Sequence, residues 1–139
     1  MTWHTGRLID HVHLRCRDFP RSRAFYQAVA QALGLTIEFQ GDDWLQLDEL
    51  YIDAAAREPA ASTPTHVHLA FQAKDIAMVH AFYAAALAAG GTDNGAPGER
   101  PYHPGYYGAF VLDPDGNNIE AVYHGPARRS AASVEIDPL

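Results

Sequence analysis

The chain has 139 residues, the size of a single domain, and 47% of them are hydrophobic while 19% are charged. This balance excludes a wholly disordered chain and supplies enough apolar surface for a core. The net charge of −7 disfavours a nucleic-acid role, because proteins bind phosphate backbones through clustered basic residues.

No segment predicts export or a membrane span. The longest nearly uncharged apolar stretch, residues 81–89, is about half as long as a membrane-spanning helix. The N-terminus lacks the basic run and apolar stretch of a signal peptide. The single cysteine, Cys16, excludes an intramolecular disulfide and a cysteine-rich zinc site. We therefore expect a cytoplasmic protein in which any metal would be bound by histidines and carboxylates.

The first elements can be predicted in chain order from local signals. Polar and apolar residues alternate from His11 to Cys16, which predicts a strand with His11 and His13 on one face. Asp18 suits a helix N-cap, apolar residues then recur at helical spacing, and Gly34 suits the helix end. Three short strand-like runs follow, at residues 35–39, 44–47 and 50–54.

The second half of the chain repeats this order. The segment His66-Val67-His68-Leu69 matches His11-Val12-His13-Leu14. Farther along, Asp75 matches Asp18, Phe82-Tyr83 matches Phe25-Tyr26, and Gly90 matches Gly34. These landmarks, in the same order, indicate an internal duplication.

The remaining strands are predicted around a tight turn. A looser stretch begins at Thr92, and strand-like runs cover residues 108–112 and 118–123. Between these two runs, Asp113-Pro114-Asp115-Gly116 has the residues of a hairpin turn. We expect one α+β domain of two tandem βαβββ modules that form a pair of half-barrels with helices outside. The modules cover about residues 7–56 and 66–124, with a linker at 57–65 and an aperiodic tail at 125–139 that frays or lies over a neighbour.

These modules resemble the vicinal-oxygen-chelate superfamily, which includes glyoxalase I, extradiol dioxygenases and bleomycin-resistance proteins. The resemblance covers roughly residues 7–124 and rests on IDHVHLRCRDFPRSRAFY, THVHLAF and GAFVLDPDGNNIEAV. Its most specific part is Asp-Pro-Asp-Gly followed after two residues by Ile119-Glu120. The resemblance implies the fold, but it does not select one activity, because this fold hosts several.

A metal site is expected where the duplicated strands present histidines and carboxylates. His11 and His66 can lie at equivalent points, and the duplication predicts Asp53 as the counterpart of Glu120. In proteins resembling glyoxalase I, the residues that match His11, Asp53, His66 and Glu120 are the metal ligands, although a Glu is usual at the position of Asp53. Without the shorter Asp53, the other three resemble the two-histidine, one-carboxylate triad of the dioxygenases.

Two alternatives stay open for the histidines. His13 and His68 lie on the same strand faces, two residues farther along, and either could be the ligand instead.

Imidazole and carboxylate ligands suit Zn, Ni, Mn, Co or Fe(II).

Residues 100–108 are the best candidate for a cavity wall or lid. Tyr106, Tyr107 and His103 offer acid or base groups there, and prolines and glycines shape the loop. The same aromatic residues could instead seal the end of the barrel. Trp44 and Gln46 could line the cavity or pack within the sheet.

The leading functional hypothesis is a metal-dependent lyase or isomerase that resembles glyoxalase I and acts on a substrate with vicinal oxygens. The alternatives are an Fe(II) extradiol dioxygenase and a metal-free binding protein similar to the bleomycin-resistance members. The sequence identifies neither the substrate nor a thiol cofactor. We expect a homodimer with a small-molecule substrate and no nucleic-acid or membrane partner, in which modules pair within one chain or across the dimer.

Overall fold

Two four-stranded mixed sheets and two helices make up the body of the molecule. The computed structural model describes residues 3–6, 8–57 and 63–138. The first module contains β2 (Val12–Cys16), α1 (Phe19–Ala32), β3 (Phe39–Gln40), β4 (Trp44–Leu47), β5 (Leu50–Ala54) and the 3-10 turn η1 (Ala55–Arg57). The second contains β6 (His68–Gln72), α2 (Ile76–Ala88), β7 (Thr92–Glu99), β8 (Tyr107–Leu112) and β9 (Asn118–Tyr123).

Both modules have the same topology. The strand order is β2-β5-β4-β3 in the first sheet and β6-β9-β8-β7 in the second. In each sheet the first and last strands of the module pair in parallel, and the other neighbours pair antiparallel. The prediction of an α+β fold with two tandem βαβββ modules is therefore confirmed.

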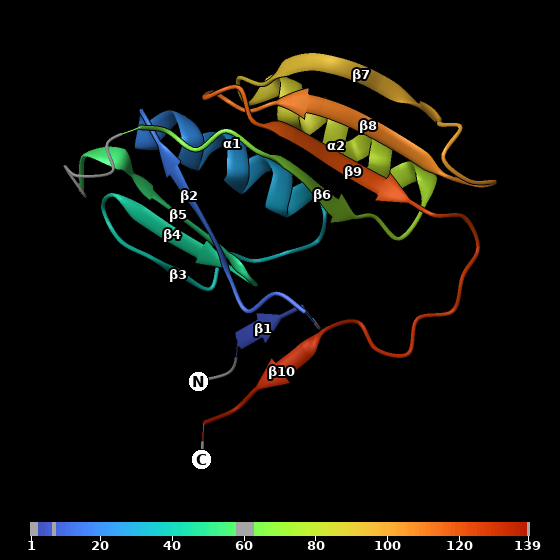
Figure 1. Ribbon diagram of the computed structural model, residues 1–139, viewed down its shortest axis with the longest axis horizontal. Coiled ribbons are helices and arrows are strands. Elements are labelled where there is room, and N and C mark those ends of the chain that lie inside the picture. The colour runs from blue at the N-terminus through green and yellow to red at the C-terminus, as the bar shows by residue number, and fades with distance from the viewer. Residues whose placement is uncertain (1–2, 7, 58–62, 139) are drawn as a thin grey trace.

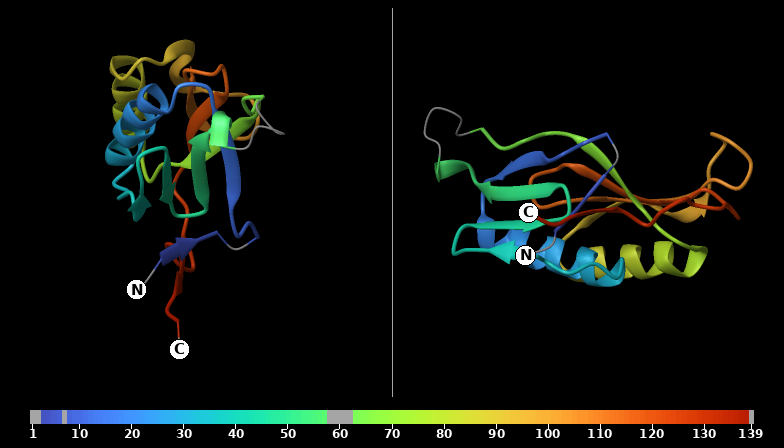
Figure 2. Two further views of the ribbon diagram at one scale, coloured as in Figure 1. Left: turned by 90° about the vertical axis from the view of Figure 1, so that its left-hand side faces the viewer. Right: turned by 90° about the horizontal axis from the view of Figure 1, so that it is seen from below.

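The two helices lie together on one side of the sheets (Figure 1). α1 contacts α2, and the view from below shows both helices on the same side (Figure 2). Within the described residues, no helix covers the opposite side. We call the uncovered faces of the first and second sheets the module-one face and the module-two face.

The helices begin and end at the predicted signals. The carboxylate of Asp18 accepts a hydrogen bond from the backbone N–H of Arg21, and that of Asp75 accepts one from Met78, at 3.2 and 2.7 Å. Such caps satisfy N–H groups that have no partner within the helix. Gly34, with φ of 72°, supplies the left-handed residue that ends α1.

The core lies between the helices and one face of each sheet. The alternating pleat directs apolar side chains toward the helices and polar side chains toward the uncovered faces. This core includes Leu14, Leu45 and Ile52 from the first sheet, Val111, Ile119 and Ala121 from the second, and Phe25 and Phe82 from the helices.

Three segments differ from the sequence predictions. The strand expected at residues 35–39 is β3, at Phe39–Gln40, because the N–H of Leu35 still bonds to the C=O of Ala30 at the end of α1. The tail contains β10 (Val134–Ile136), which pairs antiparallel with β1 (Trp3–Thr5). The predicted linker begins with Arg57 in η1, and its residues 58–62 lie outside the described residues.

The predicted turn at Asp113 joins β8 to β9 and also ties the two modules together. The buried carboxylate of Asp113 accepts hydrogen bonds from the backbone N–H groups of Asp115 and Asn117, both at 2.9 Å. It also accepts one from the hydroxyl of Tyr26 on α1, at 2.6 Å. A side chain of the first helix thus holds the turn of the second module.

We predict that Tyr26→Phe lowers the free energy of unfolding by about 1–3 kcal/mol, because it leaves a buried carboxylate short of one donor. The matched control is Tyr83→Phe, at the equivalent position of α2, where Asp93 near the hydroxyl raises the pKa of Tyr83. The control should cost at most about 0.5 kcal/mol. Chemical denaturation measures both, and equal losses would contradict the special role of the Tyr26 contact.

Candidate functional site

The module-one face carries an open cavity of about 670 Å³. Its lining comes from the start of β2, from β4 and β5, and from η1, and it is mostly polar. The lining residues are Asp10, His11, His13, Gln46, Asp48, Tyr51, Asp53 and Arg57.

A histidine and a carboxylate meet on this face. Nε2 of His13 lies 2.7 Å from Oδ1 of Asp53. Asp53 is buried, with only 4% of its surface exposed. The ring of Tyr51 packs edge-on against His13 and stacks on Trp44. Nη1 of Arg57 donates a hydrogen bond to the hydroxyl of Tyr51 and lies 4.0 Å from Oδ2 of Asp53.

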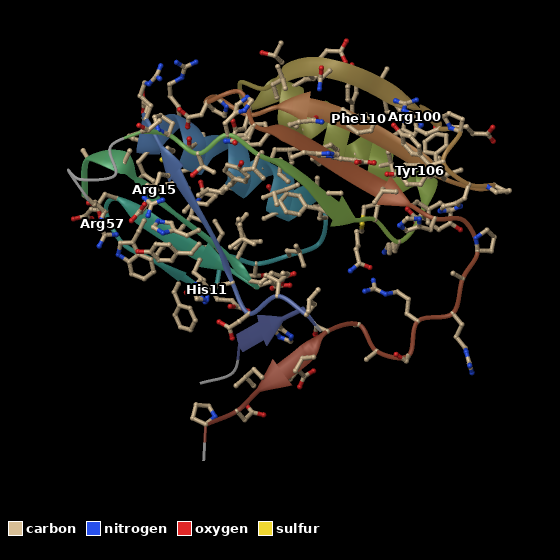
Figure 3. The ribbon with its side chains drawn as sticks, in the orientation of Figure 1. His11, Arg15, Arg57, Arg100, Tyr106 and Phe110 are labelled. Carbon is tan, nitrogen blue, oxygen red and sulfur yellow. The ribbon has the colours of Figure 1, made fainter. Side chains whose placement is uncertain are left out.

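The module-two face carries the same pair of groups. Nε2 of His68 lies 3.0 Å from Oε1 of Glu120, whose residue is 2% exposed. The other oxygen of Glu120 accepts a hydrogen bond from the hydroxyl of Tyr106. The ring of Phe110 lies next to His68 and below the guanidinium of Arg100, and Figure 3 shows Arg100, Phe110 and Tyr106 near one another at the β7–β8 hairpin.

The two pairs occupy equivalent positions of the duplicated sheets. His13 lies opposite Tyr51 in the β2–β5 pair, and Asp53 follows two residues later. His68 lies opposite Asn118 in the β6–β9 pair, and Glu120 also follows two residues later. On the neighbouring strand, Trp44 lies opposite Asp53 and Phe110 lies opposite Glu120. The duplication therefore reproduces an imidazole, a carboxylate and an aromatic ring on each uncovered face.

His11 and His66 lie just before the strands that carry these pairs. Nδ1 of His11 lies 2.7 Å from Oδ1 of Asp10, and the His11 side chain is 65% exposed at the cavity. His66 is exposed and precedes β6 by two residues. The structure thus places His13 and His68, rather than His11 and His66, in contact with the carboxylates. Strand parity alone does not separate residues two apart, and the register of the parallel strand is the signal that does.

The predicted lid residues divide between two faces. Tyr106 reaches Glu120, and His103 stacks on His124 and packs edge-on against Tyr106. The hydroxyl of Tyr107 instead contacts His80 of α2, 2.8 Å away. Burial, followed by the bond to Glu120, raises the pKa of Tyr106 above its ordinary value, so this hydroxyl keeps its proton at neutral pH and acts as a hydrogen-bond donor.

Cys16 takes no part in either pair. Its thiol is buried and donates a hydrogen bond to the backbone C=O of Asp53. Burial raises the pKa of the thiol to about 11, so it is protonated at neutral pH. Thiolate chemistry is therefore not a property of this residue.

Each histidine–carboxylate pair consists of one imidazole and one carboxylate, which are ligand types that divalent transition metals accept. Among the described residues, no three or more His, Cys, Asp or Glu side chains gather in a way that could hold a metal ion. Each pair of one chain thus supplies two donors.

Among the described residues, neither helix combines the length and the apolar character that a membrane span requires.

Comparison with known proteins identifies the family. The family model described as the Glyoxalase/Bleomycin resistance protein/Dioxygenase superfamily matches residues 8–121. The search of curated proteins finds no match.

Solved structures show the same fold. A glyoxalase/bleomycin resistance protein from Albidiferax ferrireducens T118 is 29% identical with a TM-score of 0.70, over 83% of this chain and 97% of that one. A glyoxalase/bleomycin resistance protein/dioxygenase family enzyme from Burkholderia phytofirmans PsJN is 25% identical, with a TM-score of 0.62, over 81% and 95%. A lactoylglutathione lyase from Agrobacterium tumefaciens is 20% identical with a TM-score of 0.59, over 84% and 93%, which is a likeness of fold. The chain, with its duplicated modules and matching family model, belongs to the Glyoxalase/Bleomycin resistance protein/Dioxygenase superfamily.

Proposed function

We propose that this protein is a divalent-metal-dependent lyase or isomerase, similar to glyoxalase I, that acts on a small substrate with vicinal oxygens. The observation that supports this proposal most strongly is the histidine–carboxylate pair repeated at equivalent register positions of both modules. Burying a carboxylate is costly unless it is paired, and the recurrence of this paired arrangement on the uncovered face of both modules supports a shared functional role.

The donor set fits a divalent metal when two faces meet. A module-one face and a module-two face would each supply one carboxylate and one histidine. Together these four ligands form a set suited to Zn, Ni, Mn, Co or Fe(II). In each chain α1 packs against α2 while both uncovered faces remain open. We therefore propose a homodimer in which module one of each chain faces module two of its partner, giving two equivalent sites.

The proposed ligands are Asp53 and Glu120 together with His11 and His66. His11 and His66 are exposed, so they can turn toward a metal without leaving a buried partner. His13 and His68 would then orient the carboxylates to which they bond, a role that groups around a metal commonly have. The direct contacts of His13 and His68 also make them the alternative ligands, and substitution separates the two assignments.

A bound divalent ion would polarise two adjacent substrate oxygens. Around it, the chain would enclose the substrate between Trp44 and Phe110, which lie beside the two carboxylates. Tyr106 bonds to Glu120 and His103 packs against Tyr106, and we propose that these two residues hold or move protons there. Tyr107 lies toward α2 and is not part of this proposal.

One observation favours an Fe(II) dioxygenase as the second candidate. Asp53 is a methylene shorter than Glu120, it bonds to His13, and the Arg57 guanidinium lies 4.0 Å away. If these contacts keep Asp53 from the metal, the remaining ligands form a triad. A triad leaves room for both a bidentate substrate and oxygen.

We predict that His66→Ala abolishes high-affinity Zn²⁺ binding, whereas His68→Ala weakens it by about tenfold through loss of support for Glu120. Isothermal titration of metal-free protein measures both affinities. The two variants are a matched pair, because each removes one imidazole, and the two positions lie only two residues apart, just before and at the start of β6. Full affinity in the His66 variant, with loss in the His68 variant, would transfer the ligand role to His68 and, by equivalence, to His13.

We predict that Asp53→Ala lowers Zn²⁺ affinity by at least about 100-fold if four protein ligands hold the metal. The same substitution should leave Fe(II) binding and catechol-dependent oxygen uptake intact if a triad holds it. Metal titration and an oxygen electrode distinguish these results. Unchanged metal affinity would remove Asp53 from the site and make the dioxygenase the preferred function.

A further inference from the structure

The two carboxylates are supported by different third groups. Asp53 bonds to His13 and lies near the charged guanidinium of Arg57. Glu120 bonds to His68 through one oxygen and to the hydroxyl of Tyr106 through the other. The duplicated site is therefore asymmetric. In these contacts, an uncharged hydroxyl donates to the module-two carboxylate, whereas the module-one carboxylate lies near a charged guanidinium.

The contact between Tyr106 and Glu120 depends on a residue without a side chain. A Cβ at Gly108 would lie 3.1 Å from Oε2 of Glu120 and 3.3 Å from the ring of Tyr106. Gly108 has no positive φ, so its backbone conformation does not require glycine. Room for the Glu120 carboxylate and the Tyr106 ring is therefore a specific reason for a glycine here.

The ring of Tyr106 is in contact with three other aromatic rings. Tyr102, His103 and His124 pack edge-on against it, with centroids 4.9, 5.4 and 5.2 Å away. The backbone N–H of Tyr106 donates to the C=O of His103, and its C=O accepts from the N–H of Arg100. Because the ring is already fixed, its hydroxyl loses little freedom when it holds the carboxylate.

We propose that Tyr106 is a positioning residue that fixes the Glu120 carboxylate for metal binding. The hydroxyl restrains one carboxylate oxygen and so sets the direction in which Glu120 presents its remaining lone pairs. This inference rests on the proposed metal-dependent function and adds a determinant of metal affinity that lies outside the ligand set. Hydrogen bonds to ligating carboxylates commonly have this effect.

The test compares Tyr106→Phe with Tyr107→Phe in the full-length protein. Tyr107 is the neighbouring tyrosine, and its hydroxyl bonds to His80 on the helix side, so it controls for loss of a hydroxyl from the same hairpin. We expect Tyr106→Phe to weaken Co²⁺ binding by about 10- to 100-fold and Tyr107→Phe to leave it within about twofold. The visible spectrum of the Co²⁺-loaded Tyr106 variant should differ from the wild type, a change that a loss of stability alone does not produce.

A second variant, Gly108→Ala, adds a methyl group on β8 that crowds the contact between Tyr106 and Glu120. It should also weaken Co²⁺ binding. In the double variant with Tyr106→Phe, the loss of Co²⁺ affinity should be smaller than the sum of the two single losses, because both substitutions act on one contact. Gly108→Ala decides the question by the same readouts if Tyr106→Phe does not fold.

Each outcome has a distinct meaning. Wild-type affinity and an unchanged Co²⁺ spectrum in Tyr106→Phe, with metal bound by the wild type, would overturn the positioning role and leave the proposed function standing. A wild-type protein that binds neither Co²⁺ nor Zn²⁺ would overturn both.

Discussion

The parallel pairing of the first and last strands of each module determines where the two histidine–carboxylate pairs lie. A parallel pair cannot be closed by a tight turn, so the chain passes through a helix and two more strands before the last strand returns beside the first. That crossover covers one sheet face with a helix and leaves the other uncovered. The register of the pair then brings His13 to Asp53 and His68 to Glu120.

The duplicated faces share donors but differ in the residues around them, so the two sides of the proposed site are not equivalent. Trp44 stacks on Tyr51 on the module-one face, and Tyr51 and Arg57 line the cavity. Arg100 covers Phe110 on the module-two face (Figure 3). A substrate held between two such faces would meet a different wall on each side. Discrimination between its two ends would therefore come from these walls and not from the metal ligands.

The sequence predicted the elements whose signals are local. Caps such as Asp18 and the turn at Asp113 act within a few residues, so the helices and the β8–β9 hairpin were confirmed. The three-residue pairing of β1 with β10 is not predictable from the sequence, because it joins opposite ends of the chain and has no local periodicity. The contacts of His13 and His68 do not follow from the sequence alone, for a related reason. Residues two apart on a strand share a face, and only the partner strand's register distinguishes them.

A mixed dimer tests the central claim, that two chains complete one another's sites, most directly. One chain would carry His11→Ala with Asp53→Ala, the other His66→Ala with Glu120→Ala, and the mixed dimer would be isolated through two different affinity tags. If module one of each chain faces module two of the other, one site of this dimer retains all four ligands, and we predict about one Zn²⁺ per mixed dimer and none in either parent dimer. A mixed dimer that binds no Zn²⁺, beside a wild type that does, would contradict the shared site.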